Sequence, residues 1–186
     1  SDLLGKRVAL DEVGSGTLVG AQLVLGAFGL TGDTIDVAYL KSDDAIEKLV
    51  AGELDAFFLI AGYPAKVIQW ANENTEISLV PITGAGIDAL VEGNPFLHID
   101  KIPAGIYNGV SEVKTLSVAA QWITRDDIGA ETVYGILQSL WRSDARRLLD
   151  RGHAKGRVIR LETALEGIGI PLHEGALRFY REIGLI

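Results

Sequence analysis

The first half of the chain alternates short apolar runs with segments in which apolar residues recur every three or four positions. The runs predict β-strands, and the segments between them predict helices. Four strands are predicted in this way, at residues 6–10, 35–40, 55–60 and 77–82. Regular alternation of strand and helix is typical of a parallel sheet covered by helices, because parallel strands need crossover connections. We therefore expect an α/β fold whose strands lie side by side, mostly parallel, with the first strand central.

Local signals mark where the predicted helices begin. Ser15 is placed to cap the first helix, which continues to residue 30 with almost only apolar residues and should be buried on most sides. Ser42 is placed to cap the second helix, and Pro64 suits the first position of the third. Pro81 cannot donate a hydrogen bond to a neighbouring strand, so the fourth strand should lie at an edge of the sheet or end there.

The pattern changes after Gly93. Residues 94–109 contain two prolines and two glycines without a helical stripe, so we expect an extended or looped connection there. Residues 115–124 predict another strand. Residues 130–151 predict one long helix and residues 174–183 the last helix, because apolar positions recur at helical spacing in both.

The turn between the first strand and the first helix is a candidate ligand site. The helix start offers unpaired N–H groups and the positive end of the helix dipole, framed by the hydroxyls of Ser15 and Thr17, and this combination suits an anion. By itself, Ser15 is better explained as a structural cap. Ligands of parallel sheets nevertheless bind beyond the carboxyl ends of the strands, where residues 40–42, 61–64 and 83–86 should also lie. The turn is therefore predicted to form one wall of a pocket.

The Gly14-Ser15-Gly16 sequence matches none of the motifs that it suggests. A P-loop needs a lysine where Thr17 stands, and the dinucleotide fingerprint needs a glycine where Val19 stands. A nucleophile elbow needs glycines two positions before and after its serine, but Val13 and Thr17 hold those positions. We find no catalytic constellation elsewhere in the sequence.

Composition narrows the function further. The net charge of −8 argues against a nucleic-acid partner. The longest nearly continuous apolar run, residues 18–30, is well short of the ~20 residues that a membrane helix needs. The absence of cysteine excludes disulfides and thiolate metal sites. His98, His153 and His173 share no metal-ligand spacing, so we expect neither a metal nor a cofactor.

Two tyrosines, Tyr63 and Tyr107, lie in turns rich in glycine and proline. Each has two interpretations, as a pocket wall with a hydroxyl donor or as a plain packing residue. The residues alone do not decide between these interpretations.

Five phrases along the chain resemble one known family. They are GKRVALDEVGSGT at residues 5–17, ELDAFFLIAGYPAKVI at 53–68, IPAGIYNG at 102–109, SVAAQWITRDDI at 117–128 and ALEGIGIPLHEGALRFYRE at 164–182. In this order and spacing they are similar to the TAXI subfamily of TRAP-transporter solute-binding proteins. The resemblance covers essentially the whole chain.

The resemblance implies an extracytoplasmic, periplasmic receptor with a two-lobed periplasmic-binding-protein-like fold of type II, an α/β fold. Such receptors capture a small carboxylate or an amino acid such as glutamate and deliver it to a sodium-coupled TRAP-type membrane permease, without enzymatic activity and without a cofactor. Carried over to this sequence, the implied ligand-binding residues are Ser15, Gly16, Thr17, Ala61, Gly62, Tyr63 and Tyr107.

The resemblance also implies a division into domains. Residues 1–114 correspond to an α/β ligand-binding lobe, and residues 115–186 to a hinge-crossing strand and carboxyl-terminal helices of the other lobe. Family members carry a further amino-terminal part of that other lobe, and the present sequence contains no methionine. We therefore expect a shortened or processed chain in which the other lobe is incomplete.

Two other functions use the same two-lobed fold. An enzyme, such as those of menaquinone synthesis or porphobilinogen assembly, would need an acid or base residue or a cofactor-linking cysteine in its cleft, and cysteine is absent. The effector-sensing domain of a transcription regulator would normally follow a DNA-binding helix-turn-helix. A permease gene beside the gene for this chain would favour the receptor over both.

We predict that the 186-residue chain alone binds glutamate and related acids weakly or not at all, and that it self-associates. Two-lobed receptors bury most of the ligand surface, and losing about 4 kcal/mol of contacts weakens binding by about three powers of ten. Apolar surface around residues 115–124 and the helix bearing Trp141 should then be covered by a second copy. Titration calorimetry and light scattering test this prediction, and a monomer with micromolar affinity would contradict it.

Overall fold

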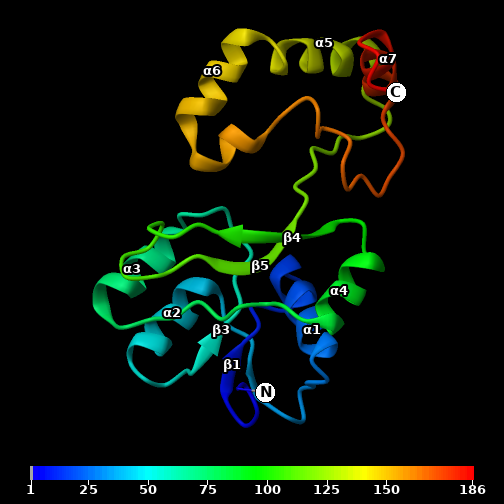
Figure 1. Ribbon diagram of the computed structural model, residues 1–186. Coiled ribbons are helices and arrows are strands. Elements are labelled where there is room, and N and C mark those ends of the chain that lie inside the picture. Colours follow the sequence, from blue (N-terminus) through cyan, green and yellow to red (C-terminus); the bar gives the residue numbers. More distant parts are fainter. Residues whose placement is uncertain (1) are drawn as a thin grey trace. The chain divides into compact units, whose positions relative to one another are not determined.

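The computed structural model describes residues 2–186, which fall into two compact units. The first unit ends at Val118, and the second comprises Ala119–Ile186. The five strands of the described residues all lie in the first unit, whereas the second unit is built from helices and loops (Figure 1). Each unit has its own hydrophobic core and is described by itself.

The first unit is built on a three-stranded parallel sheet. Strand β1 (Arg7–Ala9) lies between β2 (Asp36–Ala38) and β3 (Ala56–Phe57), and both neighbours run parallel to it. The prediction of a parallel sheet with the first strand central is confirmed for these three strands. The strands are short, so each contributes only two or three residues to the sheet.

The predicted fourth strand is wrong. Residues 77–82 form no regular strand, and the N–H group of Ile82 instead donates to the carbonyl oxygen of Lys114, 3.1 Å away. Pro81 lacks the donor that a paired strand needs, which is the physical reason for the failure.

A second sheet begins in the stretch that we expected to be an extended or looped connection, and the first part of that stretch is extended. Strand β4 (Leu97–Ile102) pairs antiparallel with β5 (Val113–Val118). Burial alternates with a period of two from His98 onward, where His98, Asp100 and Ile102 are half-buried and Ile99 and Lys101 are exposed, which is the signature of a strand with one covered face. The predicted strand at residues 115–124 is correspondingly shorter, because β5 ends at Val118.

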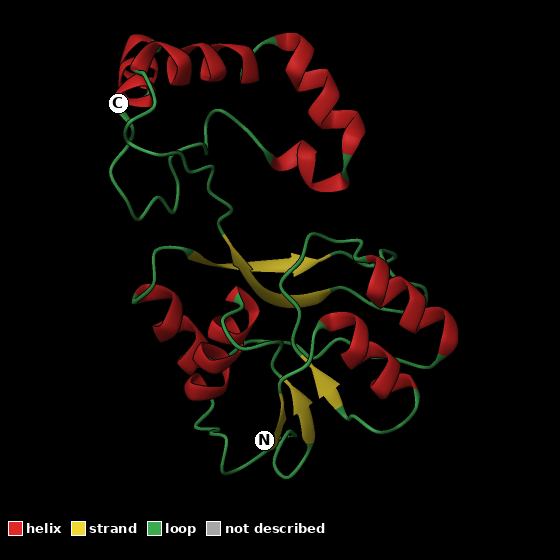
Figure 2. Ribbon diagram, turned by 180° about the vertical axis from the view of Figure 1, so that it is seen from behind, coloured by secondary structure: helices red, strands yellow, loops and turns green. Residues whose placement is uncertain are grey.

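Helices cover both sides of the parallel sheet (Figure 2). Helix α1 (Gly16–Ala27) packs beside α4 (Ala85–Glu92), and α2 (Ser42–Val50) packs beside α3 (Lys66–Asn74). Alternate residues of β1 serve the two sides because neighbouring side chains of a strand point in opposite directions. Val8 and Leu10 belong to the α1 core cluster, whereas Ala9 belongs to the α2 cluster.

Of the three helix starts that local signals predicted in the first unit, only that of α1 agrees with the structure. Ser15 is the N-cap of α1, and its hydroxyl accepts a hydrogen bond from the N–H group of Leu18 at 3.0 Å. Ser42 is the first residue of α2 rather than its cap, and Pro64 precedes the N-cap of α3 by one residue. The expectation that α1 is buried on most sides is confirmed, because its exposed residues form a single stripe, at which Val19 is 56% exposed.

Arg7 and Asp55 clamp the beginning of β1 to the beginning of β3. Both carboxylate oxygens of Asp55 accept hydrogen bonds from the Arg7 guanidinium, at 2.8 and 3.0 Å, and Oδ2 also accepts the Arg7 backbone N–H at 2.8 Å. These hydrogen bonds hold the pKa of Asp55 well below its ordinary value.

The second unit contains helices α5 (Ala130–Leu140), α6 (Ser143–Gly152) and α7 (Glu174–Glu182), with a short 3₁₀ helix η1 (Ala154–Val158) after α6. The predicted long helix at 130–151 is therefore wrong, because it is two helices interrupted at Trp141. Trp141 packs against the core between α5 and α7, and a new helix begins two residues later. The last helix is confirmed.

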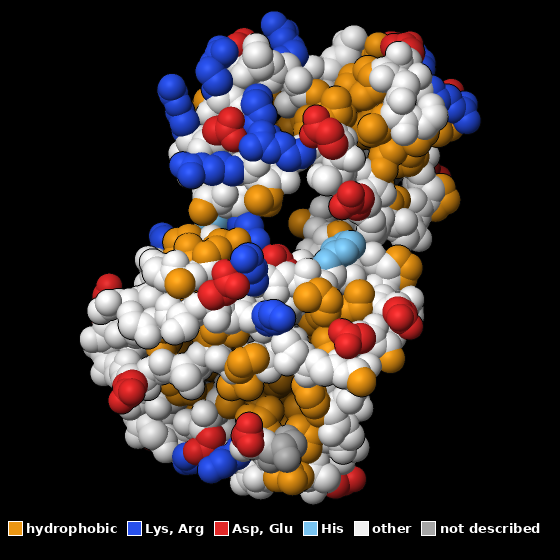
Figure 3. All heavy atoms as spheres, viewed as in Figure 1, with side chains coloured by type: hydrophobic (Ala, Val, Ile, Leu, Met, Phe, Trp, Pro, Cys, Tyr) orange, Lys and Arg blue, Asp and Glu red, His pale blue; other side chains and the backbone are white. Residues whose placement is uncertain are grey.

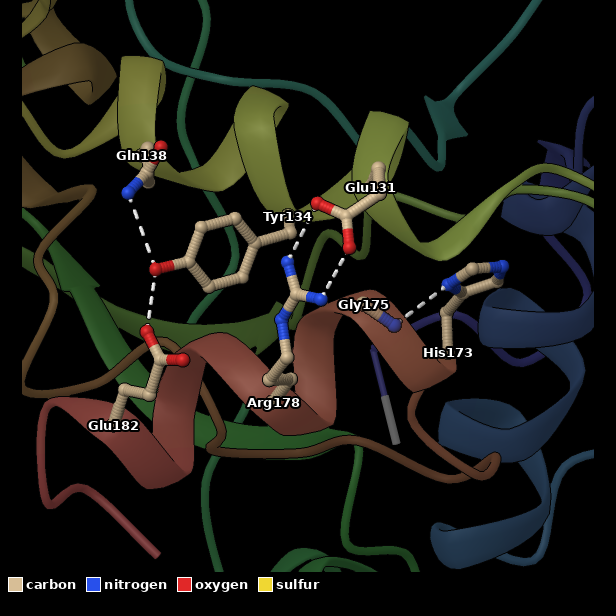
Figure 4. A network of polar contacts seen from close by, with 7 residues as sticks. All are labelled: Glu131, Tyr134, Gln138, His173, Gly175, Arg178 and Glu182. Carbon is tan, nitrogen blue, oxygen red and sulfur yellow. Dashed lines mark hydrogen bonds and ion pairs between the residues drawn. The ribbon is translucent and has the colours of Figure 1, made fainter.

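Helices α5 and α7 form the core of the second unit through buried residues at helical spacing, namely Val133, Leu137, Ala176, Phe179 and Tyr180. A polar network surrounds this core (Figure 4). Arg178 on α7 donates to both carboxylate oxygens of Glu131 on α5, at 2.5 and 3.0 Å, and lies 4.0 Å from the centre of the Tyr134 ring. The Tyr134 hydroxyl donates to Glu182, which joins the other end of α7 to α5.

Gly175 allows α7 to approach α5 closely. A Cβ atom at this position would overlap the carbonyl oxygen of Ala130 and lie 2.9 Å from the backbone nitrogen of Tyr134. The neighbouring His173 caps α7, since its Nδ1 accepts the Gly175 N–H at 3.1 Å, as Figure 4 shows. His173 is thus a structural histidine.

We expect the first unit to lose stability as the pH falls below about 4. The folded state holds the pKa of Asp55 below its ordinary value, so its contribution is complete above that value and is lost as the pH falls toward the folded pKa. Asp55→Asn should lower the urea midpoint at neutral pH and reduce this acid dependence, followed by circular dichroism. An equal effect from Asp33→Asn, at an exposed aspartate, would contradict a specific role of the clamp.

Two glycine substitutions in the second unit should change stability in opposite directions. Gly175→Ala forces α7 away from α5 and should destabilise the fold by about 1–3 kcal/mol. Gly135→Ala places its Cβ where no atom lies within 4 Å, and should stabilise α5 by up to about 1 kcal/mol. Urea titrations compare the two variants, and a neutral Gly175→Ala would show that the helices are not tightly packed.

Candidate functional site

The carboxyl ends of β1, β2 and β3 share one edge of the sheet because the three strands are parallel. Each strand is followed there by a loop and a helix start, at α1, α2 and α3. Loops at this edge are held by a rigid sheet while their own residues remain accessible. The candidate site lies in the loops after β1 and β3.

The loop after β1 turns sharply at Asp11. This residue has a φ of +77°, the left-handed region that aspartate tolerates better than most residues, and its Oδ1 accepts the N–H of Glu12 at 2.8 Å. The turn directs the chain into the cap of α1. Because the Ser15 hydroxyl is engaged with Leu18, its role in the described structure is that of a cap.

Thr17 is the polar residue that α1 buries. It is 8% exposed, and no hydrogen bond of its hydroxyl is found within residues 2–186. The N–H groups of Gly16 and Thr17, at the first positions of the helix, have no acceptor one turn earlier in the helix. The first turn contains no acidic residue, in contrast with α2, whose first turn holds Asp43 and Asp44. The start of α1 therefore offers hydrogen-bond donors in a positive local potential.

The loop after β3 lies beside α1. A Cβ atom at Gly20, in the second turn of α1, would lie 2.7 Å from Cδ1 of Ile60, so the helix and this loop are in close contact. Ala61 and Gly62, which follow, are exposed, and Tyr63 is half-buried. The structure thus brings the two predicted segments, residues 15–17 and 61–63, to the same edge of the sheet.

Tyr63 also lies within electrostatic range of Lys101 on the second sheet. The ammonium group of Lys101 on β4 forms an ion pair with Glu112 at 2.9 Å. Hydrogen bonding and charge from Glu112 raise the pKa of Lys101, and Tyr63 contributes a smaller effect in the same direction. Lys101 therefore places a positive charge close to the loop after β3.

Tyr107 is buried and contacts the start of α3. It is 5% exposed, and its hydroxyl oxygen accepts the N–H of Ala65, the N-cap of α3, at 2.9 Å. Tyr107 thus holds the end of the loop after β3 in place through a hydrogen bond. No local signal indicates this contact, because the two residues are 42 positions apart.

The three histidines of the chain have separate places in the structure. His98 lies on β4, His153 accepts the N–H of Lys155, and His173 caps α7. No group of three or more histidine or acidic side chains in residues 2–186 is placed to hold a metal ion. In the same range, no helix is long and apolar enough to cross a membrane.

A parallel sheet with helices on both sides and binding loops at one edge is compatible with a periplasmic-binding-like fold. The chain belongs to the NMT1-like family, whose model matches residues 1–184. This is a family of periplasmic-binding-like proteins, which bind solutes rather than catalyse reactions and are typically extracytoplasmic. The family supports a solute-binding domain and a small-molecule ligand.

Tyr107→Phe should loosen the loop after β3 without emptying the core. The ring remains and only the hydroxyl is lost, so the Ala65 N–H loses its acceptor at a cost of about 1 kcal/mol. Hydrogen exchange of the Ala65 amide should accelerate, and the urea midpoint should fall slightly. Tyr39→Phe, at a tyrosine that is 54% exposed, is the matched control and should change neither quantity.

Proposed function

We propose that this chain is the solute-binding part of an extracytoplasmic receptor of the TAXI type. In this proposal it captures a small carboxylate, such as glutamate or a related amino acid, and passes it to a sodium-coupled TRAP-type permease. The observation that carries the proposal is Thr17, a nearly buried polar residue without an internal hydrogen bond at the start of α1. Membership of the NMT1-like family supports the class of function.

A carboxylate suits the start of α1 for electrostatic reasons. The N–H groups of Gly16 and Thr17 and the Thr17 hydroxyl supply donors, and hydrogen bonds to a charged acceptor are stronger than neutral ones. The positive end of the helix dipole adds to the attraction. The net charge of −8 does not oppose this locally, because charges farther than about 8–10 Å are screened by salt.

The loop after β3 is proposed as the second wall of the site. The exposed backbone of Ala61 and Gly62 and the hydroxyl of Tyr63 would contact the ligand, and Tyr107 would hold this wall in place through Ala65. The proposal includes a type II periplasmic-binding arrangement, in which residues 1–114 form the ligand-binding lobe. Residues 115–186 would then belong to the hinge and the other lobe.

Thr17→Ala should weaken binding of the carboxylate ligand by about 1–2 kcal/mol, because it removes one hydrogen bond to a charged group. This corresponds to roughly a 5- to 30-fold rise in Kd. Thr17→Ser keeps the hydroxyl and should retain most of the affinity. Titration calorimetry of the parent protein and its variants with glutamate and a panel of small acids measures the effect.

Thr124→Ala is the control, because this threonine is exposed and lies in the second unit. Equal affinities for the parent protein, Thr17→Ala and Thr124→Ala would exclude the start of α1 as the site. A strict preference for uncharged ligands would exclude the carboxylate.

A further inference from the structure

The second unit carries a concentrated positive charge in an otherwise acidic chain. Residues 142–160 contain seven Arg or Lys and two Asp, a net charge of +5, whereas the whole chain has −8. These residues form α6, η1 and their flanks. Figure 3 shows Lys and Arg side chains gathered over the region where Figure 1 places α6. We call this region the basic surface; its exposed arginines are Arg142, Arg147, Arg151, Arg157 and Arg160.

One arginine of the segment has an internal role. Arg146 donates to Asp150 at 2.7 Å and to the carbonyl oxygen of Gly156 at 2.6 Å, and thereby holds η1 against α6. Arg146 first, and then the charges of Arg160 and Arg157, lower the pKa of Asp150. Of the described arginines, Arg146 alone contacts this carboxylate, while Arg157 and Arg160 add positive charge near it.

Two other arginines of the basic surface have no internal partner among the described residues. Arg147 forms an exposed ion pair with Asp144, and Arg160 acts on Asp150 through its charge alone. The side chains of Arg142 and Arg151, in contrast, make no hydrogen bond or ion pair within residues 2–186. Exposed charges without partners add nothing to the packing of this unit, so they are available to an external anion.

Apolar side chains are exposed between these arginines. Leu148 on α6 is 73% exposed, Val158 60% and Ile159 43%. A single exposed aliphatic residue is ordinary in a folded protein. Here three of them lie within the segment that carries the free arginines, and residues 142–160 contain no aromatic residue.

We propose that α6 and η1 form a peripheral docking surface for the anionic headgroups of a phospholipid bilayer. Long basic side chains around exposed aliphatic ones are the composition of helices that lie in a membrane interface. The exposed aliphatic side chains of Leu148, Val158 and Ile159 suit burial in the acyl boundary below the headgroups. The acidic remainder of the chain does not prevent the contact, since its field is screened beyond about 8 Å.

The proposal uses the second unit only and does not rest on the solute site. It is tested by sedimentation of the 186-residue chain with large unilamellar vesicles. The chain should bind vesicles that contain phosphatidylglycerol, should not bind vesicles of pure phosphatidylcholine, and should be released as salt is added.

The decisive variant is Arg142→Gln/Arg151→Gln/Arg160→Gln. Each basic residue near an anionic bilayer contributes about a fivefold gain in partition, so the triple variant should bind roughly a hundredfold more weakly. The control is Lys6→Gln/Lys66→Gln/Lys114→Gln, which removes the same charge from exposed lysines of the first unit and should bind like the parent. Circular dichroism and thermal melting confirm that both variants fold.

A single substitution distinguishes insertion of apolar side chains into the bilayer interface from electrostatic attraction to its headgroups alone. Leu148→Ser leaves the charge unchanged and should reduce binding by about tenfold, because burial of the leucine in the interface is lost. Unchanged binding of this variant would overturn the interfacial part of the proposal.

Three results would overturn the proposal as a whole. The first is equal binding to neutral and anionic vesicles, and the second is unchanged binding of the arginine triple variant. The third is a different partner for the same arginines. Binding to polyglutamate without binding to vesicles would assign the surface to an acidic protein, and a dimer that only the triple variant dissociates would assign it to a second copy of the chain.

Discussion

The first unit depends on the burial of Val8 and Ala9 of β1 between two strands and two layers of helices. Val8 and Ala9 are 0% exposed, and they point to opposite sides of the sheet. A strand that is apolar on both faces is stable only in the middle of a covered sheet, so β2 and β3 must flank it and helices must cover it. Helix α1 covers one of these faces. It begins after a short turn at the end of β1, and its buried side chains pack against Val8 and Leu10.

In this arrangement, polar groups without internal partners lie at the carboxyl edge of the sheet. The carboxyl edge of the sheet gathers the start of α1 and the loop after β3, and Gly20 allows Ile60 to approach the helix there. Thr17 and the first amides of α1 keep their hydrogen-bonding capacity at this edge. The Tyr107 hydroxyl oxygen accepts the Ala65 N–H and so contributes rigidity to this edge.

The second unit is stabilised by the packing of two helices rather than by a sheet. Its core lies between α5 and α7, which approach closely at Gly175 and are joined at both ends by the Arg178–Glu131 pair and the Tyr134–Glu182 hydrogen bond. Charge is distributed unevenly between the units, with nine more acidic than basic residues up to Val118 and one more basic than acidic residue after it. The arginines of α6 and η1 and their flanks account for this difference.

Local signals determined much of this protein. The apolar run of β1, the hydroxyl of Ser15 before α1 and the helical spacing of residues 174–183 each act within a few residues, and the structure agrees with all three. Tertiary contacts decided the rest. Strand β4 exists because β5 pairs with it, Trp141 ends α5 where its ring joins a core formed with α7, and one stripe of α1 is exposed where neither the sheet nor α4 covers it. Tyr107 meets Ala65 across 42 residues, a partner that only the folded chain can supply.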